Sequence, residues 1–122
     1  QRDLSKKEES LIDRVSESSR MAPLANLILE IDRRLAESEK ERAVLLFLRN
    51  LAMKKAMQMV SGTRRDIDAK RVLHYVLDEH SRNVQNISRS LNLREENVRR
   101  ILADLRISGS DSNELQWNEF HQ

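Results

Sequence analysis

Residues 82–100 concentrate side chains that can bind phosphate groups and the edges of nucleic-acid bases. Arginine forms bidentate hydrogen bonds with phosphate or guanine, and asparagine and glutamine can pair with adenine. The candidate contact residues are Arg82, Gln85, Asn86, Arg89, Arg94, Asn97, Arg99 and Arg100. The elements that would carry these residues decide whether they can reach a ligand together.

The distribution of charge along the chain also indicates this segment as the one that could contact a nucleic acid. The net charge is only +2, from 22 Lys and Arg against 20 Asp and Glu, which is too balanced to indicate a nucleic-acid partner by itself. Residues 81–106, however, hold six arginines against three acidic residues, a local charge of +3. Residues 107–122 hold three acidic residues and no lysine or arginine. The basic segment is therefore followed directly by an acidic tail.

The sequence gives little support for a metal site or a catalytic site elsewhere in the chain. His74 and Asp78 share a helix face at i, i+4, but a metal site needs three or more converging ligands, and no HExxH pattern is present. The chain has no cysteine and only two glycines, so thiolate chemistry and a glycine-rich phosphate loop are excluded. We expect no cofactor, no metal and no enzymatic activity.

Composition predicts a helical protein of one domain. The 122 residues include two glycines, one proline and 3% aromatic residues, so residues that favour turns and strands are scarce. No apolar run reaches the roughly 18 residues of a membrane span. The absence of cysteine is typical of a reducing compartment, so we expect an intracellular protein, either cytoplasmic or associated with a nucleoid or nucleus. The chain opens with Gln1, which favours a processed protein or a piece of a longer one.

Two helices are predicted in the first 37 residues. A capping box from Ser5 to Glu8 opens a helix to about Ser18. Its apolar stripe is thin, so we expect it to dock on another chain or to fray. Pro23 suits the first turn of a second helix that ends near Glu37.

The longest predicted helix covers residues 39–60 and follows a second capping box, Ser38 to Glu41. Apolar residues cover nearly all its sides, which predicts either the central pillar of a bundle or a dimer core. Its methionines fit core filling. A further helix over about residues 66–80 follows, and Trp117 and Phe120 near the end of the chain are expected to fold back onto the bundle.

The apolar pattern of residues 84–105 changes phase once, at Asn92. Ile87 marks the inner face of a first short helix, Ser88 is the small residue where two helices would cross, and Asn92 tolerates a left-handed backbone. After the turn, Leu93, Val98 and Ile101 form the inner stripe of a second helix. At these residues the sequence resembles the helix-turn-helix superfamily of DNA-binding proteins, and is similar to its winged-helix branch, over residues 66–106.

The resemblance implies that the second helix, residues 94–105, enters the major groove of double-stranded DNA. Arg94, Asn97, Arg99 and Arg100 would face bases or phosphates there. Gln85, Asn86 and Arg89 of the first helix would lie against the DNA backbone, and Arg82 would add a phosphate contact. Glu95 and Glu96 count against this interpretation because carboxylates repel phosphates. The wing would be vestigial, since residues 107–117 carry only acidic charge.

We therefore expect an all-α fold, a bundle of about five helices with a C-terminal helix-turn-helix. The predicted regions are a helical dimerisation region (1–65), the helix-turn-helix region (66–106) and a tail (107–122), within one compact domain. The predicted function is sequence-specific DNA binding by a homodimer formed through residues 39–60, as in a transcriptional regulator or a plasmid or phage maintenance factor. The alternative is a helical protein-interaction module, or a subunit of a larger assembly, without DNA contact. RNA binding is a weaker third option.

Overall fold

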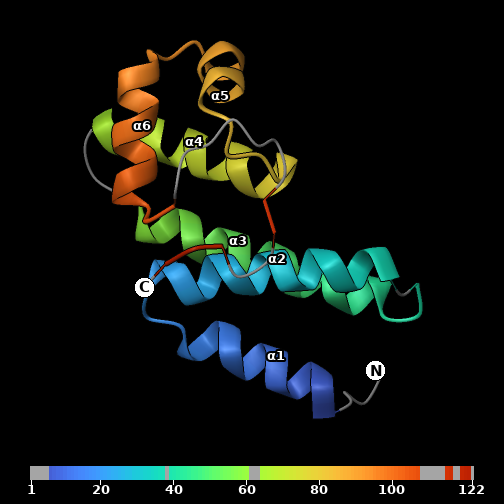
Figure 1. Ribbon diagram of the computed structural model, residues 1–122. Helices are drawn as coiled ribbons and strands as arrows, with labels where there is room; N and C mark the ends of the chain where they lie inside the picture. Colours follow the sequence, from blue (N-terminus) through green and yellow to red (C-terminus); the bar gives the residue numbers. More distant parts are fainter. Residues whose placement is uncertain (1–5, 38, 61–63, 108–114, 117–118, 122) are drawn as a thin grey trace.

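The computed structural model describes residues 6–37, 39–60, 64–107, 115–116 and 119–121. These residues form six α-helices and no β-strand (Figure 1): α1 (Lys6–Glu17), α2 (Met21–Glu37), α3 (Arg42–Met59), α4 (Arg64–Glu79), α5 (Val84–Leu91) and α6 (Glu95–Asp104). The predicted all-α class is confirmed. The expected wing falls mostly on residues 108–114 and 117, outside the described residues, and Leu115 and Gln116 are in neither a helix nor a strand.

Helices α2 and α3 form an antiparallel hairpin at the centre of the molecule (Figure 1). α1 packs on one side of this pair and α4 on the other, with α5 and α6 beyond α4. One contiguous cluster of buried side chains includes members from all six helices. Among the helices so described, none combines the length and apolar character that crossing a membrane requires.

α1 packs within its own chain, which differs from the expectation that it would fray or dock elsewhere. Two of its few apolar residues are buried, since Leu11 and Val15 are only 3% and 2% exposed. The ammonium of Lys55 on α3 donates to the backbone oxygens of Val15 (2.7 Å) and Ser16 (2.9 Å). A cation at a helix C-terminus satisfies carbonyls that have no partner within the helix. This contact compensates for the thin apolar stripe of a helix that the capping box predicted, and the described residues form six helices where about five were expected.

α3 begins later than the second capping box predicted. Its first helical residue is Arg42, and Glu41 immediately before it makes no side-chain capping hydrogen bond. Glu41 instead lies 3.7 Å from the guanidinium of Arg34 on α2. Ser38 is outside the described residues. The Glu41 carboxylate therefore has a charged neighbour on α2, which a local motif does not reveal.

Burial of α3 is one-sided, although its composition predicted burial on most sides. Leu45, Leu48 and Ala52 are completely or almost completely buried against α1, α2 and α4. Leu46, Phe47 and Leu51 remain 39%, 57% and 39% exposed. The methionines do fill the core as expected: Met53 is buried, and Met57 and Met59 are partly buried against the core.

The C-terminal segment returns to α2. Phe120 is 3% exposed, and its backbone N–H and C=O bond with the side-chain amide of Asn26, both at 2.9 Å. The backbone N–H of Leu115 donates to the carbonyl of His80. Phe120 thus folds back as predicted, whereas Trp117 lies outside the described residues. The segment links the end of α4 to the first half of α2.

Arg49 of α3 joins three helices through an ion-pair network in which Arg49 and Asp32 are mostly buried, whereas Asp78 and His80 are partly exposed. Its Nε donates to Asp32 of α2, and its Nη2 donates to Asp78 of α4 at 2.9 Å. The other Asp32 oxygen lies 2.8 Å from Nε2 of His80. Burial by itself lowers the pKa of Arg49, but the hydrogen bonds and charges of Asp32 and Asp78 outweigh it and raise the pKa. A raised pKa keeps the guanidinium charged, so its contribution is lost only in strongly alkaline solution.

Two helices end in left-handed backbone at residues that are not glycine. His80 follows α4 with a φ of 49°, and Arg106 follows α6 with a φ of 61°. Around Arg106, the N–H of Ile107 donates to the carbonyl of Leu102 and the N–H of Arg106 to that of Ala103, both at 3.0 Å. This is the Schellman arrangement, in which glycine is the usual left-handed residue.

Replacing Arg49 with methionine should lower the free energy of unfolding by about 2 kcal/mol, because the mostly buried Asp32 loses its main charged partner. Urea denaturation followed by circular dichroism measures this change. Arg99→Met is the matched control, since Arg99 makes an exposed i, i+4 pair with Glu95, and such pairs contribute about 0.5 kcal/mol or less. Equal effects of the two substitutions would contradict the bracing role of Arg49.

Replacing Arg106 with glycine should raise the free energy of unfolding by about 1 kcal/mol, because glycine removes the steric cost of the left-handed conformation. The melting temperature would rise accordingly. Arg100→Gly, in the interior of α6, should instead lower stability by about 1 kcal/mol. A loss of stability in Arg106→Gly would show that the Arg106 side chain itself contributes to the fold.

Candidate nucleic-acid interface

α5 is a short helix that starts at a side-chain cap. The Oδ1 atom of Asn83 accepts a hydrogen bond from the backbone N–H of Asn86 at 2.9 Å. Such an N-cap satisfies one of the donors that the first helical turn leaves unpaired. Val84 and Ile87 on the inner side are 3% and 0% exposed. The helix is thereby fixed in rotation, with Gln85 and Arg89 on its exposed side.

The turn after α5 has the geometry that its sequence predicts. Asn92 adopts a left-handed backbone with φ 55° and ψ 49°. The backbone N–H groups of Asn92 and Leu93 both donate to the carbonyl of Ser88, and the Ser88 hydroxyl donates to the carbonyl of Leu93. A small residue at Ser88 lets Leu93 approach closely and pack partly buried against the core. The direction in which α6 leaves the turn is set by these bonds.

α6 separates an apolar inner side from a charged outer side. Val98, Ile101 and Leu102 are 0%, 3% and 0% exposed. Arg99, Arg100 and Glu96 fall on the opposite side of the helix and are exposed. α5 and α6 cross steeply at the end of the molecule away from α1 (Figure 1). The outer side of α6 therefore faces solvent and no other described helix covers it.

α4 holds the C-terminal end of α5 through contacts that the sequence did not indicate. Nη2 of Arg71 donates to the carbonyl of Leu91, the last residue of α5, at 2.7 Å. The hydroxyl of Ser90 lies 3.3 Å from that of Tyr75. Arg71 looks like an ordinary surface residue in sequence, because its acceptor is a backbone atom 20 residues away. The apolar periodicity of the sequence does not indicate a contact between a side chain and a distant backbone carbonyl.

Arg94, immediately before α6, and Arg99 and Arg100 on α6 are loosely held. The side chain of Arg94 is 82% exposed and lies 3.7 Å from Glu96, and that of Arg99 is 64% exposed and lies 3.8 Å from Glu95. Arg100 is exposed and has no ion-pair partner within the described part of the chain. Exposed pairs at such distances contribute little stability, so these guanidinium groups can move to a ligand at small cost.

The polar residues of the predicted set are placed at different depths. Gln85 and Arg89 are exposed, whereas Asn86 and Asn97 are half-buried. Nη2 of Arg89 donates to Oδ1 of Asn86 at 2.7 Å. Asn86 therefore orients Arg89 rather than standing free on the surface.

Arg82 departs from the predicted set. Its Nη1 donates to Glu119 of the C-terminal segment at 2.7 Å, and the two side chains are only 21% and 22% exposed. Its Nε atom is buried and has no hydrogen-bond partner within the described residues. The acidic tail thus occupies Arg82, which we remove from the candidate interface. The remaining charged residues of α5 and α6 on this face are four arginines and two glutamates: Arg89, Arg94, Arg99, Arg100, Glu95 and Glu96.

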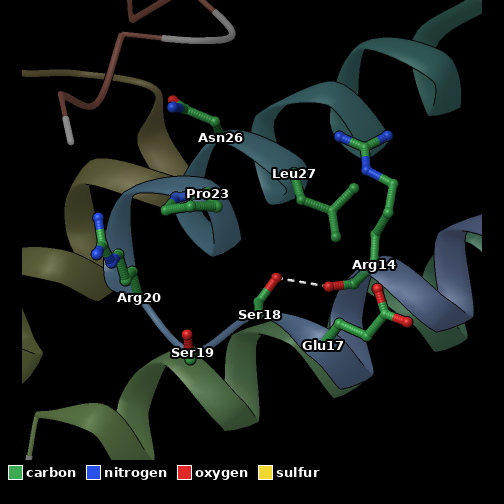
Figure 2. Close-up of a pocket in the computed structure, with 8 residues that line it drawn as sticks. All are labelled: Arg14, Glu17, Ser18, Ser19, Arg20, Pro23, Asn26 and Leu27. Carbon is green, nitrogen blue, oxygen red and sulfur yellow. Dashed lines mark hydrogen bonds between the residues drawn. The ribbon is translucent and has the colours of Figure 1, made fainter.

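Two other surface features carry polar groups that are already engaged within the chain. Between the end of α1 and the start of α2, Arg14, Ser18, Arg20 and neighbouring residues line an open hollow (Figure 2). The Arg14 guanidinium is already bonded to Glu30 at 2.6 Å, and the Ser18 hydroxyl donates to the Arg14 carbonyl. His74 pairs with Asp78, as its spacing predicted, at 3.2 Å. Among the described residues, no three potential metal ligands come together.

No family model, curated protein or solved structure matches this chain. The geometry of α4, α5 and α6 is therefore the basis for its functional interpretation.

Replacing Ser88 with leucine should destabilise the protein by about 2 kcal/mol, because the larger side chain overpacks the turn and removes the hydroxyl bond to Leu93. Thermal unfolding measures the change. Gln85→Leu is the control, since Gln85 is exposed on the same helix, and we expect a change of about 0.5 kcal/mol or less. Equal losses at the two positions would show that the close approach at Ser88 does not set the packing of α6.

Proposed function

We propose that the protein binds double-stranded DNA through a helix-turn-helix formed by α5, the turn at Asn92 and α6. The observation that carries this proposal is the two-sided character of α6. Its apolar side is fully packed, while Arg94, Arg99 and Arg100 stand exposed on or beside the side that faces solvent. A helix held in this way can enter the major groove without any rearrangement of the core.

In the proposed complex, different residues of α6 and α5 would make different kinds of contact with DNA. Arg100 lies near the centre of the outward side and Arg99 at its edge, and at either place a guanidinium can bind guanine in bidentate fashion or grip a phosphate. Asn97 is half-buried at the edge of that side and would contact only a base that lies deep in the groove. On α5, Gln85 and Arg89 would contact the phosphate backbone and set the register.

We further propose that the protein acts as a homodimer, as a transcriptional regulator or a plasmid or phage maintenance factor does. One short recognition helix makes few base contacts, and two helices about one DNA turn apart multiply them. The exposed apolar side chains of α3, in the region predicted for dimerisation, support this proposal.

A protein-interaction module is the second candidate, and the glutamates of α6 favour it. Glu95 and Glu96 are 50% and 75% exposed next to the arginines, where they would oppose phosphates. Glutamates in a first helical turn also stabilise the helix dipole. Fluorescence polarisation with mixed-sequence DNA at low salt separates the two candidates, because a DNA-binding protein shows salt-sensitive affinity even for non-specific sites. A flat titration would favour the interaction module.

The double substitution Arg99→Ala and Arg100→Ala should weaken DNA binding at least tenfold, since each arginine is expected to contribute about 1 kcal/mol or more. The slope of log K against log salt should also become shallower by roughly one to two. Arg20→Ala is the control for loss of a surface charge, because Arg20 is also exposed but lies before α2. Unchanged affinity in the double variant, with helical circular dichroism intact, would remove α6 from the interface.

A further inference from the structure

One line of residues runs along α6 directly opposite its buried side. Glu96, Arg100 and Ala103 recur at four- and three-residue spacing, so they share one face of the helix, and all three are exposed. The buried residues of α6 lie on the other face. We call Glu96, Arg100 and Ala103 the outward line of α6.

Position on α6 decides whether a side chain would reach bases or phosphates. In a helix that lies in the major groove, the outermost residues face the base edges, and residues on the two flanks face the sugar-phosphate backbones. Arg99 lies on one flank of the outward line and the half-buried Asn97 on the other. Because base contacts come mainly from the N-terminal residues of such a helix, Glu96 and Arg100 are better placed for them than Ala103.

We propose that the outward line of α6 recognises G·C base pairs, with Arg100 bound to guanine and Glu96 to the amino group of cytosine. In the major groove, guanine presents two acceptors, O6 and N7, which match two guanidinium donors, and cytosine presents the N4 amino donor, which a carboxylate accepts. Recognition of adenine uses the side-chain amide of asparagine or glutamine. None of the exposed residues from Glu95 to Asp104, a stretch that the structure describes throughout, carries such an amide.

The spacing of Glu96 and Arg100 sets the separation of the two bases. Four residues of α-helix rise about 6 Å, and successive base pairs are about 3.4 Å apart. A helix aligned along the groove therefore places these two side chains over base pairs that are one or two steps apart.

Both side chains can reach a base without breaking a strong contact. The Glu96 carboxylate lies 3.7 Å from the guanidinium of Arg94, and both side chains are largely exposed. Such a pair contributes little free energy, so Glu96 can exchange it for a cytosine amino group at small cost. Arg100 has no ion-pair partner among the described residues. Opposite guanine or thymine, the Glu96 carboxylate would meet acceptor oxygens, so it would also disfavour the wrong base.

This inference rests on the proposed function, because it names the base pairs that the α6 interface would read. The two can nevertheless fail separately. Salt-sensitive binding with equal affinity for G·C-rich and A·T-rich duplexes of the same length would overturn the base preference and leave DNA binding standing. Absence of binding to any duplex at low salt would overturn both.

The first experiment selects bound duplexes from a random library with the purified protein. The selected sites should contain a guanine and a cytosine in base pairs one or two steps apart. Replacing that guanine with 7-deazaguanine, which lacks the N7 acceptor, should weaken binding about tenfold, because a hydrogen bond to a charged group is lost. In Arg100→Ala the same replacement should change the affinity by less than about twofold. Selected sites without these two bases, or an equal loss in Arg100→Ala, would overturn the proposal.

The second experiment compares Glu96→Gln with Glu95→Gln. Both substitutions remove one negative charge from the first turn of α6, but Glu95 lies next to the buried side of the helix and not on the outward line. Glu96→Gln should replace cytosine with adenine at one position of the selected site, with a change of about tenfold in relative affinity, since a glutamine amide pairs with adenine. Glu95→Gln should strengthen binding to every duplex by about two- to threefold and leave the preferred sequence unchanged. The same preferred sequence in both variants would overturn the role of Glu96.

Discussion

The ion-pair network around Arg49 fixes how the two halves of the molecule meet. α2 and α3 form a hairpin that packs through leucine and isoleucine side chains, and apolar packing alone permits sliding. Arg49 fixes the relative orientation of α2, α3 and α4, because its planar guanidinium must contact Asp32 on α2 and Asp78 on α4 at the same time. α4 in turn carries α5 and α6. The orientation of the exposed arginines of α6 thus depends on a cation buried two helices away.

Each of the last three helices is followed by a left-handed residue, and only one of these residues was predictable. Asn92 tolerates this conformation better than most residues and lies at a phase change in the apolar pattern, so the turn was expected. His80 and Arg106 adopt similar backbone angles without any such signal in their residue type. Both are held by other contacts: the His80 carbonyl accepts from Leu115, and the Arg106 carbonyl accepts from His121. The C-terminal segment therefore fixes two helix ends that local sequence leaves undetermined.

The sequence predicted the helices better than it predicted their partners. Apolar periodicity identified the inner sides of α5 and α6 correctly, since Ile87, Val98 and Ile101 are all buried. It could not assign Arg82 to Glu119, because that pair joins residues far apart in the chain. For the same reason α1 was expected to fray or to dock on another chain, although Lys55 of its own chain supplies the missing contacts. Patterns within one helix report which side is buried, whereas long-range ion pairs follow from how the helices are arranged.

The contrast between Arg82 and the arginines of α6 bears on the proposed function. Arg82 is largely buried against Glu119 and would lose a strong, shielded contact if it moved to a phosphate. Arg94 and Arg99 lie 3.7 and 3.8 Å from glutamates in full solvent, where exchange of one anion for another costs little. In the proposed complex Glu95 and Glu96 then have two effects. They hold the guanidinium groups near the outward side of α6 before binding, and they penalise any phosphate that approaches without compensating contacts. A weakly attractive face of this kind disfavours non-specific DNA more than a purely basic one, and so increases the share of affinity that depends on the base sequence.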